Sequence, residues 1–366
     1  MNYIPVYQPS LRGNEKKYLQ DCIDSGWISS RGKYIEEFEF KFSKFISSKY
    51  ATTCSNGTTA LHLALIALGI KPGDNILVPN FSYVASFNCI KYMQANPVFV
   101  DVNSDDWTID IDHLKLILDK VKIKAVIFVN MYGFSGKIKQ ITEICKKRGI
   151  YVVEDAAEGL GSKLNDDYFG TFGDIATFSF FGNKTMTTGE GGMVCSNSFD
   201  LIEAVRSYKS HCVSRFEEYE HDDVGFNYRM TNMSAAIGCA QLERVESFLK
   251  LKRDIAEFYK NQLAGYDFKY QKQQHHETSS YWMFSMQVET EEIRDLLREH
   301  LKIKGIETRR AFRQATKMKP YFSEVRYQNS EIIANTALNL PSFPDLKTEE
   351  LTYICDSIKE FYELHK

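Results

Sequence analysis

Short apolar strands separated by helical segments constrain the fold of this chain more than any other feature. Four stretches are apolar at almost every position: N-I-L-V-P (75–79), K-A-V-I-F-V-N (124–130), I-Y-V-V-E-D (150–155) and I-A-T-F-S-F-F (175–181). A strand with one face in water alternates apolar and polar residues, whereas a strand covered on both faces does not. Because segments with helical character separate such strands, as at 56–68, the first half predicts an α/β fold with a mostly parallel sheet.

The ends of these strands are the first place to look for a binding site. In open parallel sheets, ligands bind beyond the carboxyl ends of the strands. This rule indicates Asn130, Asp155 and the loops that follow them.

The pattern changes near residue 240. A long helical segment leads into a polar stretch at 269–280, a strand at 281–288, two helices and a last helix. We therefore expect a large domain over 1–245, with an N-terminal arm, and a smaller C-terminal α+β domain over 246–366.

Composition excludes several classes of protein. A net charge of −3 argues against a nucleic-acid-binding protein. The longest apolar stretches, such as 60–68, are too short to span a membrane.

The eight cysteines form no C-x-x-C pair, so no metal or redox site is predicted. The first residues do not resemble an export signal, and we expect a cytoplasmic location.

Lys184 follows the aromatic strand 175–181 and precedes the glycine-rich T-T-G-E-G-G. It could simply extend to water at a strand end. Alternatively, it is a lysine that forms a Schiff base with a carbonyl compound, which partial burial favours by lowering the pKa of the amine.

Asp155 and the stretch S-N-G-T (55–58) bear on this choice. Asp155 could cap the helix that follows it, or it could hold the ring nitrogen of pyridoxal phosphate (PLP) in its protonated form. Gly57 and Thr58 open a helix where a phosphate could bind, and Ser179 could reach the same phosphate. Neither G-x-x-x-x-G-K-[ST] nor G-x-G-x-x-G is present to indicate a nucleotide phosphate loop.

Four blocks together resemble the DegT/DnrJ/EryC1/StrS family of PLP-dependent sugar aminotransferases, with the GDP-perosamine synthases as the most similar branch. The blocks are S-N-G-T-T-A-L-H-L-A-L, V-V-E-D-A-A-E, G-T-F-G-D-I-A-T-F-S-F-F-G-N-K-T-M-T-T-G-E-G-G and G-F-N-Y-R-M-T-N, in this order. The likeness covers nearly the whole chain. It implies the aspartate-aminotransferase (type I) fold, PLP as cofactor, and a homodimer with active sites at the subunit interface.

The resemblance also implies a role for each matching residue. Lys184 would form the Schiff base and move the proton, and Asp155 would pair with the ring nitrogen. Glu158 would lie by the phenolic oxygen of the cofactor, and Tyr83 would stack on its ring. The phosphate would be held by Gly57, Thr58 and Ser179, and by Asn227 from across the interface. Arg229 would bind a substrate carboxylate or form an ion pair at the interface.

The reaction implied is the transfer of an amino group from an amino acid, with L-glutamate expected, to a carbonyl compound. A nucleotide-linked 4-keto-6-deoxy sugar for bacterial surface polysaccharide is the acceptor that the likeness favours. Relatives that dehydrate sugars have a histidine in place of the lysine, so Lys184 argues against dehydration. Lys184, Asp155 and Glu158 together argue against a protein that only binds PLP or a sugar.

Two stretches depart from the GDP-perosamine synthases, at 312–321 and at 207–213, where His211 lies. The first has Thr316 in place of a histidine and adds basic residues. These basic residues could bind phosphate or could form a solvated surface. The departures leave open a second acceptor, a small phosphorylated ketone such as dihydroxyacetone phosphate. The candidate substrate residues in these stretches and beside them are His211, Arg309, Arg310, Arg313, Lys317 and Lys319.

Overall fold

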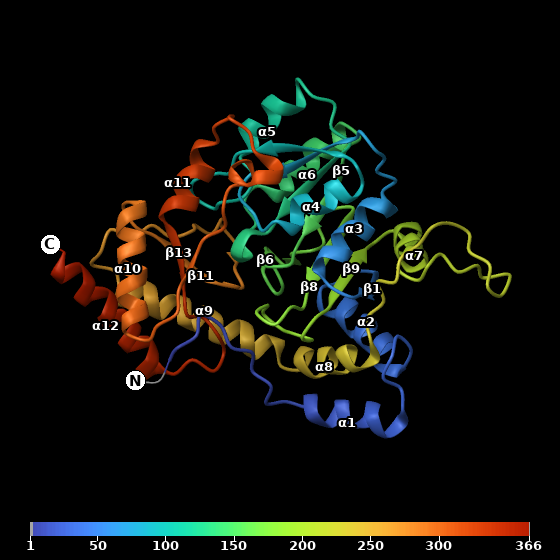
Figure 1. Ribbon diagram of the computed structural model, residues 1–366, viewed down its shortest axis with the longest axis horizontal. Helices are drawn as coiled ribbons and strands as arrows, with labels where there is room; N and C mark the ends of the chain where they lie inside the picture. The colour runs from blue at the N-terminus through green and yellow to red at the C-terminus, as the bar shows by residue number, and fades with distance from the viewer. Residues whose placement is uncertain (1–2, 366) are drawn as a thin grey trace.

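A seven-stranded sheet forms the centre of the larger part of the molecule (Figure 1). The computed structural model describes residues 3–365. From edge to edge the strands follow the order β1, β9, β8, β5, β4, β2, β3, and β9 is antiparallel to both neighbours while β8, β5, β4, β2 and β3 pair in parallel. The predicted mostly parallel sheet is therefore confirmed. The strands are β1 (Tyr50–Cys54), β2 (Asn75–Pro79), β3 (Asn96–Val100), β4 (Ala125–Val129), β5 (Tyr151–Asp155), β8 (Ile175–Ser179) and β9 (Gly192–Ser196).

Helices cover both faces of this sheet, which explains why its central strands are apolar at most positions. In β5, Val153 packs in one core cluster with α3, whereas Val152 packs in another with α6. On β8, the ring of Phe178 lies 5.0 Å from that of Phe42 on α2. The helices of this part are α1 (Glu15–Ser25), α2 (Lys33–Phe45), α3 (Gly57–Ala67), α4 (Ala85–Tyr92), α5 (Ile111–Leu118), α6 (Ile138–Lys147), α7 (Phe199–Tyr208) and α8 (Asn232–Leu242).

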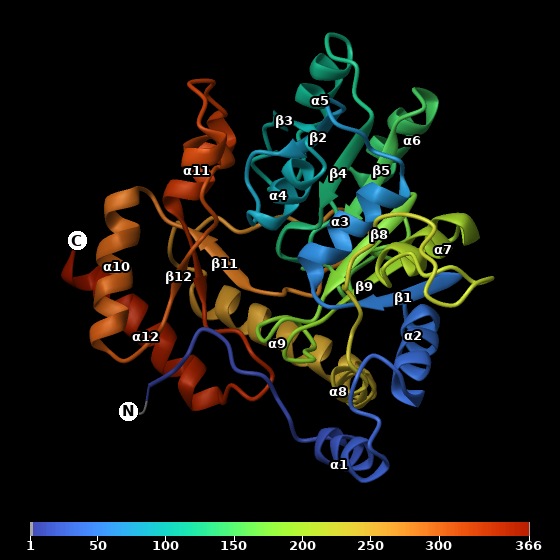
Figure 2. The same ribbon diagram turned by 45° about the vertical axis from the view of Figure 1, so that its right-hand side comes forward.

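The C-terminal part has a small antiparallel sheet of its own, in the order β11, β13, β12 (Figure 2). Its separate core includes Tyr259, Phe284, Leu297, Leu338 and Ile354. A large α/β unit with a smaller α+β unit is thus the architecture observed, as predicted. The elements of the small unit are α9 (Val245–Gln262), β11 (Phe284–Gln287), α10 (Glu291–Ile303), β12 (Arg309–Arg310), α11 (Gln328–Thr336), β13 (Ala337–Leu340) and α12 (Thr348–Leu364).

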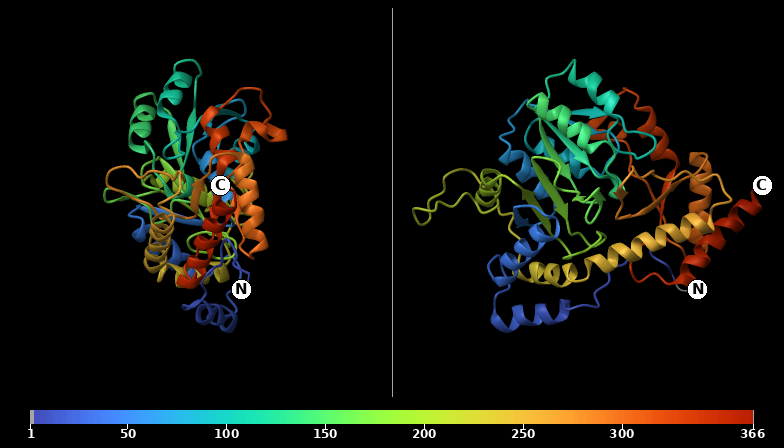
Figure 3. Two further views of the ribbon diagram at one scale, coloured as in Figure 1. Left: turned by 90° about the vertical axis from the view of Figure 1, so that its left-hand side faces the viewer. Right: turned by 180° about the vertical axis from the view of Figure 1, so that it is seen from behind.

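The helix α9 connects the two units (Figure 3). The long helical segment expected here is interrupted between α8 and α9, close to the predicted boundary at 245. Leu249 of α9 packs in a core of the large unit, whereas Ile255 packs in the core of the small one. At the N-terminus, Ile4 bridges to Ile306 and packs in the small core. The division into 1–245 and 246–366 stays a prediction. Leu249 lies in the predicted small domain but packs with the large unit, and Ile4 lies in the predicted large domain but packs with the small one.

The expected strand 281–288 is shorter than predicted, because β11 begins only at Phe284. Trp282 and Met283 precede it and pack in the core of the large unit. A short sheet also joins β10 (Glu277–Thr278) to β6 (Lys163–Leu164) and β7 (Asp167–Tyr168) of the large unit. The chain between α9 and β11 thus returns to the large unit. In residues 3–365 we find no helix with the length and apolar character that crossing a bilayer requires.

Candidate active site

A cavity of about 660 Å³ lies where the carboxyl edge of the large sheet meets the small unit. β5 and β8 end at this cavity, α3 begins at it, and β12 and Trp282 line it from the C-terminal part. The structure brings most of the predicted site residues together here. The predicted residues that line it are Gly57, Thr58, Tyr83, Asp155, Glu158, Ser179, Lys184, Arg309 and Arg310.

Lys184 lies in the turn that follows β8. Gly189 adopts φ +82° in this turn, a left-handed conformation in which a side chain would be strained. The carbonyl of Lys184 accepts a hydrogen bond of 2.5 Å from the hydroxyl of Tyr7. Its side chain is 13% exposed, and Nζ lies 3.9 Å from Oε1 of Glu158. Burial lowers the pKa of Lys184, and Glu158 and Asp155 oppose part of that shift.

Asp155 is the last residue of β5 and is buried. Its Oδ2 accepts a hydrogen bond of 2.7 Å from the hydroxyl of Ser86, on α4. Oδ1 accepts a longer one, of 3.3 Å, from the N–H of Ala157. Burial raises the pKa of Asp155, although Ser86 and the charge of Lys184 counteract it. The carboxyl group would therefore gain from a further donor, such as a protonated ring nitrogen.

Glu158 is buried beside Lys184. Its Oε2 accepts a hydrogen bond of 2.8 Å from the backbone N–H of Tyr132. Burial raises the pKa of Glu158 to about 7, with Lys184 opposing the shift. A carboxyl group with this pKa can gain or lose a proton near neutrality.

The first turn of α3 faces the same cavity. The side chain of Asn56 caps this helix by accepting a hydrogen bond of 2.9 Å from the N–H of Thr59. Gly57 and Thr58 are the first two helical residues, and their N–H groups have no carbonyl within the helix to bond. A Cβ on Gly57 would lie 2.7 Å from Cβ of Ser179, so a side chain there would displace that residue. The positive end of the helix and these donors suit a phosphate.

Tyr83 lies at the mouth of the cavity, with 57% of its surface exposed. Its ring packs against Phe312 at a centroid distance of 5.7 Å. Tyr132 stacks between Phe312 and Trp282, at 5.4 and 5.8 Å. One wall of the site is therefore aromatic.

Several predicted residues do not line this cavity. His211, Asn227 and Arg229 lie on and beside the loop that follows α7, which projects from the molecule in Figure 3. The side chain of Asn227 accepts hydrogen bonds of 3.1 and 3.3 Å from Arg229. Arg313 and Lys317 are exposed elsewhere on the surface. Asn130, at the end of β4, is fully buried and does not reach the cavity.

The structure also identifies lining residues that the sequence did not. Ser86 and Trp282 contact Asp155 and Lys184 respectively. Tyr228, next to the predicted Asn227, and Asn339, on β13, also line the cavity. No sequence pattern indicates these four, because each is brought to the site by packing between distant segments.

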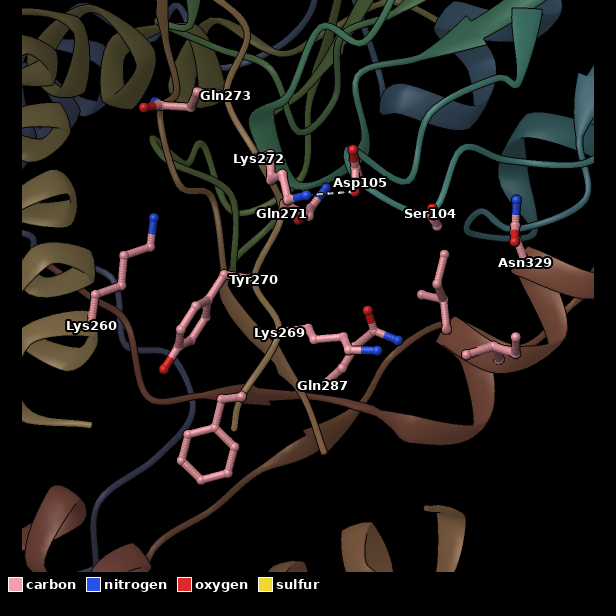
Figure 4. A pocket seen from close by; sticks show the side chains of 13 residues that line it. Ser104, Asp105, Lys260, Lys269, Tyr270, Gln271, Lys272, Gln273, Gln287 and Asn329 are labelled. Atoms are coloured by element: carbon pink, nitrogen blue, oxygen red, sulfur yellow. Dashed lines mark ion pairs between the residues drawn. The ribbon is translucent and has the colours of Figure 1, made fainter. Parts of the chain in front are cut away.

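A second and larger hollow, of about 950 Å³, lies between the large unit and the region of α9, β11 and α11 (Figure 4). Lys272 forms an ion pair of 2.9 Å with Asp105 across it. The amide of Gln271 donates hydrogen bonds of 2.8 and 3.1 Å to the carbonyls of Asp106 and Met131. These side chains join the two units, and none of the predicted site residues lines this hollow. In residues 3–365, no cluster of three His, Cys, Asp or Glu side chains is arranged to hold a metal ion.

The first cavity fits pyridoxal phosphate by the chemistry of its donor set. It offers donors for a phosphate at α3, a buried carboxyl group for the ring nitrogen, and a buried lysine. Together with the large α/β unit and the smaller α+β unit, this arrangement defines an aminotransferase of the aspartate-aminotransferase (type I) fold.

The chain belongs to the DegT/DnrJ/EryC1/StrS aminotransferase family, whose sequence profile matches residues 9–359. It is 48% identical to a GDP-perosamine synthase of Escherichia coli O157:H7, over 99% of both chains. It is 46% identical to that of Vibrio cholerae, over 98% of this chain and 99% of the other. A solved chain from Streptococcus pneumoniae, in its PLP form, is 26% identical with a TM-score of 0.93 over 99% of both chains. The predicted family, fold, enzyme class and PLP cofactor are confirmed.

Proposed function

We propose that this enzyme transfers an amino group from L-glutamate to the keto group of a nucleotide-linked 4-keto-6-deoxy sugar. The observation that carries this proposal is identity above 45% to two GDP-perosamine synthases along nearly the whole chain, with the lysine, aspartate and helix terminus in one cavity. The amino sugar formed would serve bacterial surface polysaccharide synthesis, as the sequence predicted.

In this proposal Gly57, Thr58 and Ser179, at the first turn of α3, would hold the phosphate of the cofactor. Asp155 would accept a hydrogen bond from the ring nitrogen, and Tyr83 would pack on the ring. Glu158, with a pKa of about 7, would lie by the phenolic oxygen. When bound, PLP supplies an electron sink for the charge that proton removal leaves on the substrate carbon.

Lys184 moves the proton in both halves of the reaction. Because burial lowers its pKa, more of the amine is neutral near pH 7 than in an exposed lysine. As a neutral amine, Nζ takes the proton from the α-carbon of the donor. It then delivers this proton to the carbon on the other side of the donated nitrogen. With the acceptor, the same nitrogen moves the proton in the opposite direction.

A homodimer is part of the proposal. The loop after α7 exposes Phe216, Tyr219 and Val224 at 97%, 87% and 82%, and the segment between α1 and α2 exposes Trp27 at 56%. Large apolar side chains that are this exposed suit contact with a second copy. Asn227 and Arg229 lie at the base of this loop and would reach the cavity of the partner. The cytoplasmic location, and the absence of nucleic-acid and membrane partners, stay predictions.

The alternative acceptor, a small phosphorylated ketone, has less support. It rested on a group of basic residues at 309–319, but only Arg309 and Arg310 line the cavity, while Arg313 and Lys317 do not. The relatives at 46–48% identity are both GDP-perosamine synthases. Dehydration and simple binding find no support, because Lys184 is present and buried.

The acceptor can be identified in a half-reaction. Enzyme loaded with pyridoxamine phosphate is mixed with one candidate carbonyl compound at a time, and the absorption spectrum reports return of the cofactor to the aldehyde form. We expect GDP-4-keto-6-deoxymannose to restore that spectrum. If only dihydroxyacetone phosphate restores it, the nucleotide-sugar proposal is wrong.

A further inference from the structure

The indole of Trp282 lies directly against the amine of Lys184. Nζ is 3.9 Å from the centroid of the ring, and Oε1 of Glu158 is also 3.9 Å from Nζ. A cation over the face of an indole is attracted by the ring quadrupole, and the attraction is larger where water is excluded. The amine of Lys184 therefore has two contacts that favour its protonated form, one anionic and one aromatic.

Trp282 is held firmly in this position. It is 4% exposed, and its Nε1 donates a hydrogen bond of 2.7 Å to the carbonyl of Asn183, the neighbour of Lys184. Its ring stacks on Tyr132 with an interplanar angle of 17°. The indole cannot turn away from Lys184 without losing both contacts.

Tyr132 connects the two groups that face Nζ. Its ring stacks on Trp282, and its N–H donates the hydrogen bond of 2.8 Å to Glu158. Tyr132 has φ +53°, a left-handed conformation that is uncommon for a residue with a side chain. Residues kept in such conformations are concentrated at functional sites. One strained residue therefore fixes both partners of the lysine.

We propose that Trp282 is a positioning residue for Lys184, whose amine it holds beside Glu158 while that amine carries the proton it transfers. This inference rests on the proposed function, in which Lys184 is released and must then transfer a proton. A free lysine side chain has many rotamers, and an indole contact restricts them. The nitrogen then stays near the reacting carbon.

The other charged groups around Lys184 do not depend on the indole. Asp155 and Glu158 face the amine from the large unit, and Arg309 and Arg310 line the cavity from β12. The hydroxyl of Tyr7 bonds the lysine carbonyl rather than the amine. Removal of the indole therefore removes one attraction for the ammonium form and leaves these charges in place.

The test uses cofactor-free enzyme. Acetic anhydride acetylates the neutral amine, and peptide mass spectrometry gives the rate at Lys184 over a range of pH, with surface lysines as internal references. The midpoint is the pKa of Lys184. In Trp282→Leu we expect this midpoint to fall by about one pH unit, and in Trp282→Phe by less. In the loaded enzyme, Trp282→Leu should lower kcat with glutamate about tenfold with little change in KM.

A second arm keeps the shape of the ring. Protein from cells grown on 5-fluorotryptophan has fluorinated indoles, whose faces attract cations less strongly. Trp282→Phe grown in the same way is the matched control, because only Trp27 and Trp107 are fluorinated in it. We expect the midpoint of Lys184 to fall on fluorination of the unsubstituted enzyme only. An unchanged midpoint, or an equal fall in the control, would overturn the proposal. If Trp282→Leu does not fold, this fluorination experiment alone tests the proposal. Failure of the unsubstituted enzyme to bind PLP would contradict the proposed function instead, because these midpoints need no cofactor.

Discussion

The hydroxyl of Ser86 donates a hydrogen bond of 2.7 Å to the carboxyl group of Asp155. Both side chains are buried, and they come from α4 and from the end of β5. The bond fixes the direction in which the carboxyl group faces the cavity. It also favours the ionised form that a protonated ring nitrogen requires, against the effect of burial.

Ser86→Ala and Asp155→Ala should therefore form a graded series. Loss of a hydrogen bond to a charged group costs about 1.5–3 kcal/mol, so Ser86→Ala should lower kcat by about ten- to a hundredfold. Asp155→Ala, which removes the carboxyl group itself, should lower it by more than about a hundredfold. Steady-state kinetics measures both, and circular dichroism checks that the fold is intact. Unchanged turnover in Asp155→Ala would refute its role.

Gly57→Ala should weaken binding of PLP at its phosphate. The added Cβ would lie 2.7 Å from Cβ of Ser179, which must then shift from its place beside the helix terminus. We expect at least a tenfold higher Kd for PLP, measured by titration of the apoenzyme. Gly182→Ala is the matched control, because its Cβ would meet no atom within 4 Å. Equal affinities in the two variants would contradict a phosphate site at α3.

A basic residue that lines the cavity and one that lies outside it should differ in their effect on KM for the acceptor. Arg310 lines the cavity, with an ion pair of 2.6 Å to Asp295 to orient it, whereas Arg313 lies outside. Arg310→Ala should raise KM for the nucleotide sugar about tenfold, since arginine binds phosphate strongly. Arg313→Ala should change it less than about twofold. The reverse order would favour a phosphate site on the surface around 313–319.

Stability of the apoenzyme should fall as pH rises through the weakly acidic range. Glu154 is buried, and burial raises its pKa to about 7. Between its unfolded pKa, about 4.3, and that value, the folded state binds more protons than the unfolded state, so the free energy of unfolding decreases with pH.

In Glu154→Gln that decrease should be smaller by about 3 kcal/mol between pH 4 and pH 8. Urea unfolding at each pH measures it. The exposed Glu246→Gln is the control and should follow the unsubstituted enzyme. A parallel pH dependence in Glu154→Gln would show that this carboxyl group is ionised without cost in the folded state.

Local sequence patterns were sufficient for the parallel sheet and the two-unit architecture, and the resemblance to the family supplied the cofactor. Each strand carries its own signature of two-sided burial, and Lys184 and Asp155 stand at strand ends, where the topology of a parallel sheet brings side chains together. Ser86 and Trp282 could not be predicted in this way. Their contacts depend on how α4 packs beside β5 and on how the chain before β11 returns to the large unit, and neither arrangement has a local pattern.

The basic stretch at 309–319 has a clear pattern in sequence that did not indicate which of its residues line the cavity. Its residues are close in sequence, and from the sequence they could either bind phosphate together or form a solvated surface. In the structure, β12 directs Arg309 and Arg310 to the cavity, while the chain beyond turns Arg313 and Lys317 to solvent. Proximity in sequence does not decide which side of an irregular segment faces a ligand.

Lys184 is proposed as the lysine that bonds the cofactor, and this role has a direct test. It is tested by loading the enzyme with PLP, reducing it with borohydride and mapping the phosphopyridoxyl group by peptide mass spectrometry. We predict the group on Lys184 alone, with no incorporation in Lys184→Ala. The buried Lys252, whose pKa burial lowers to about 7, is a competing amine. A label on Lys252, or no label on the unsubstituted enzyme, would contradict the account.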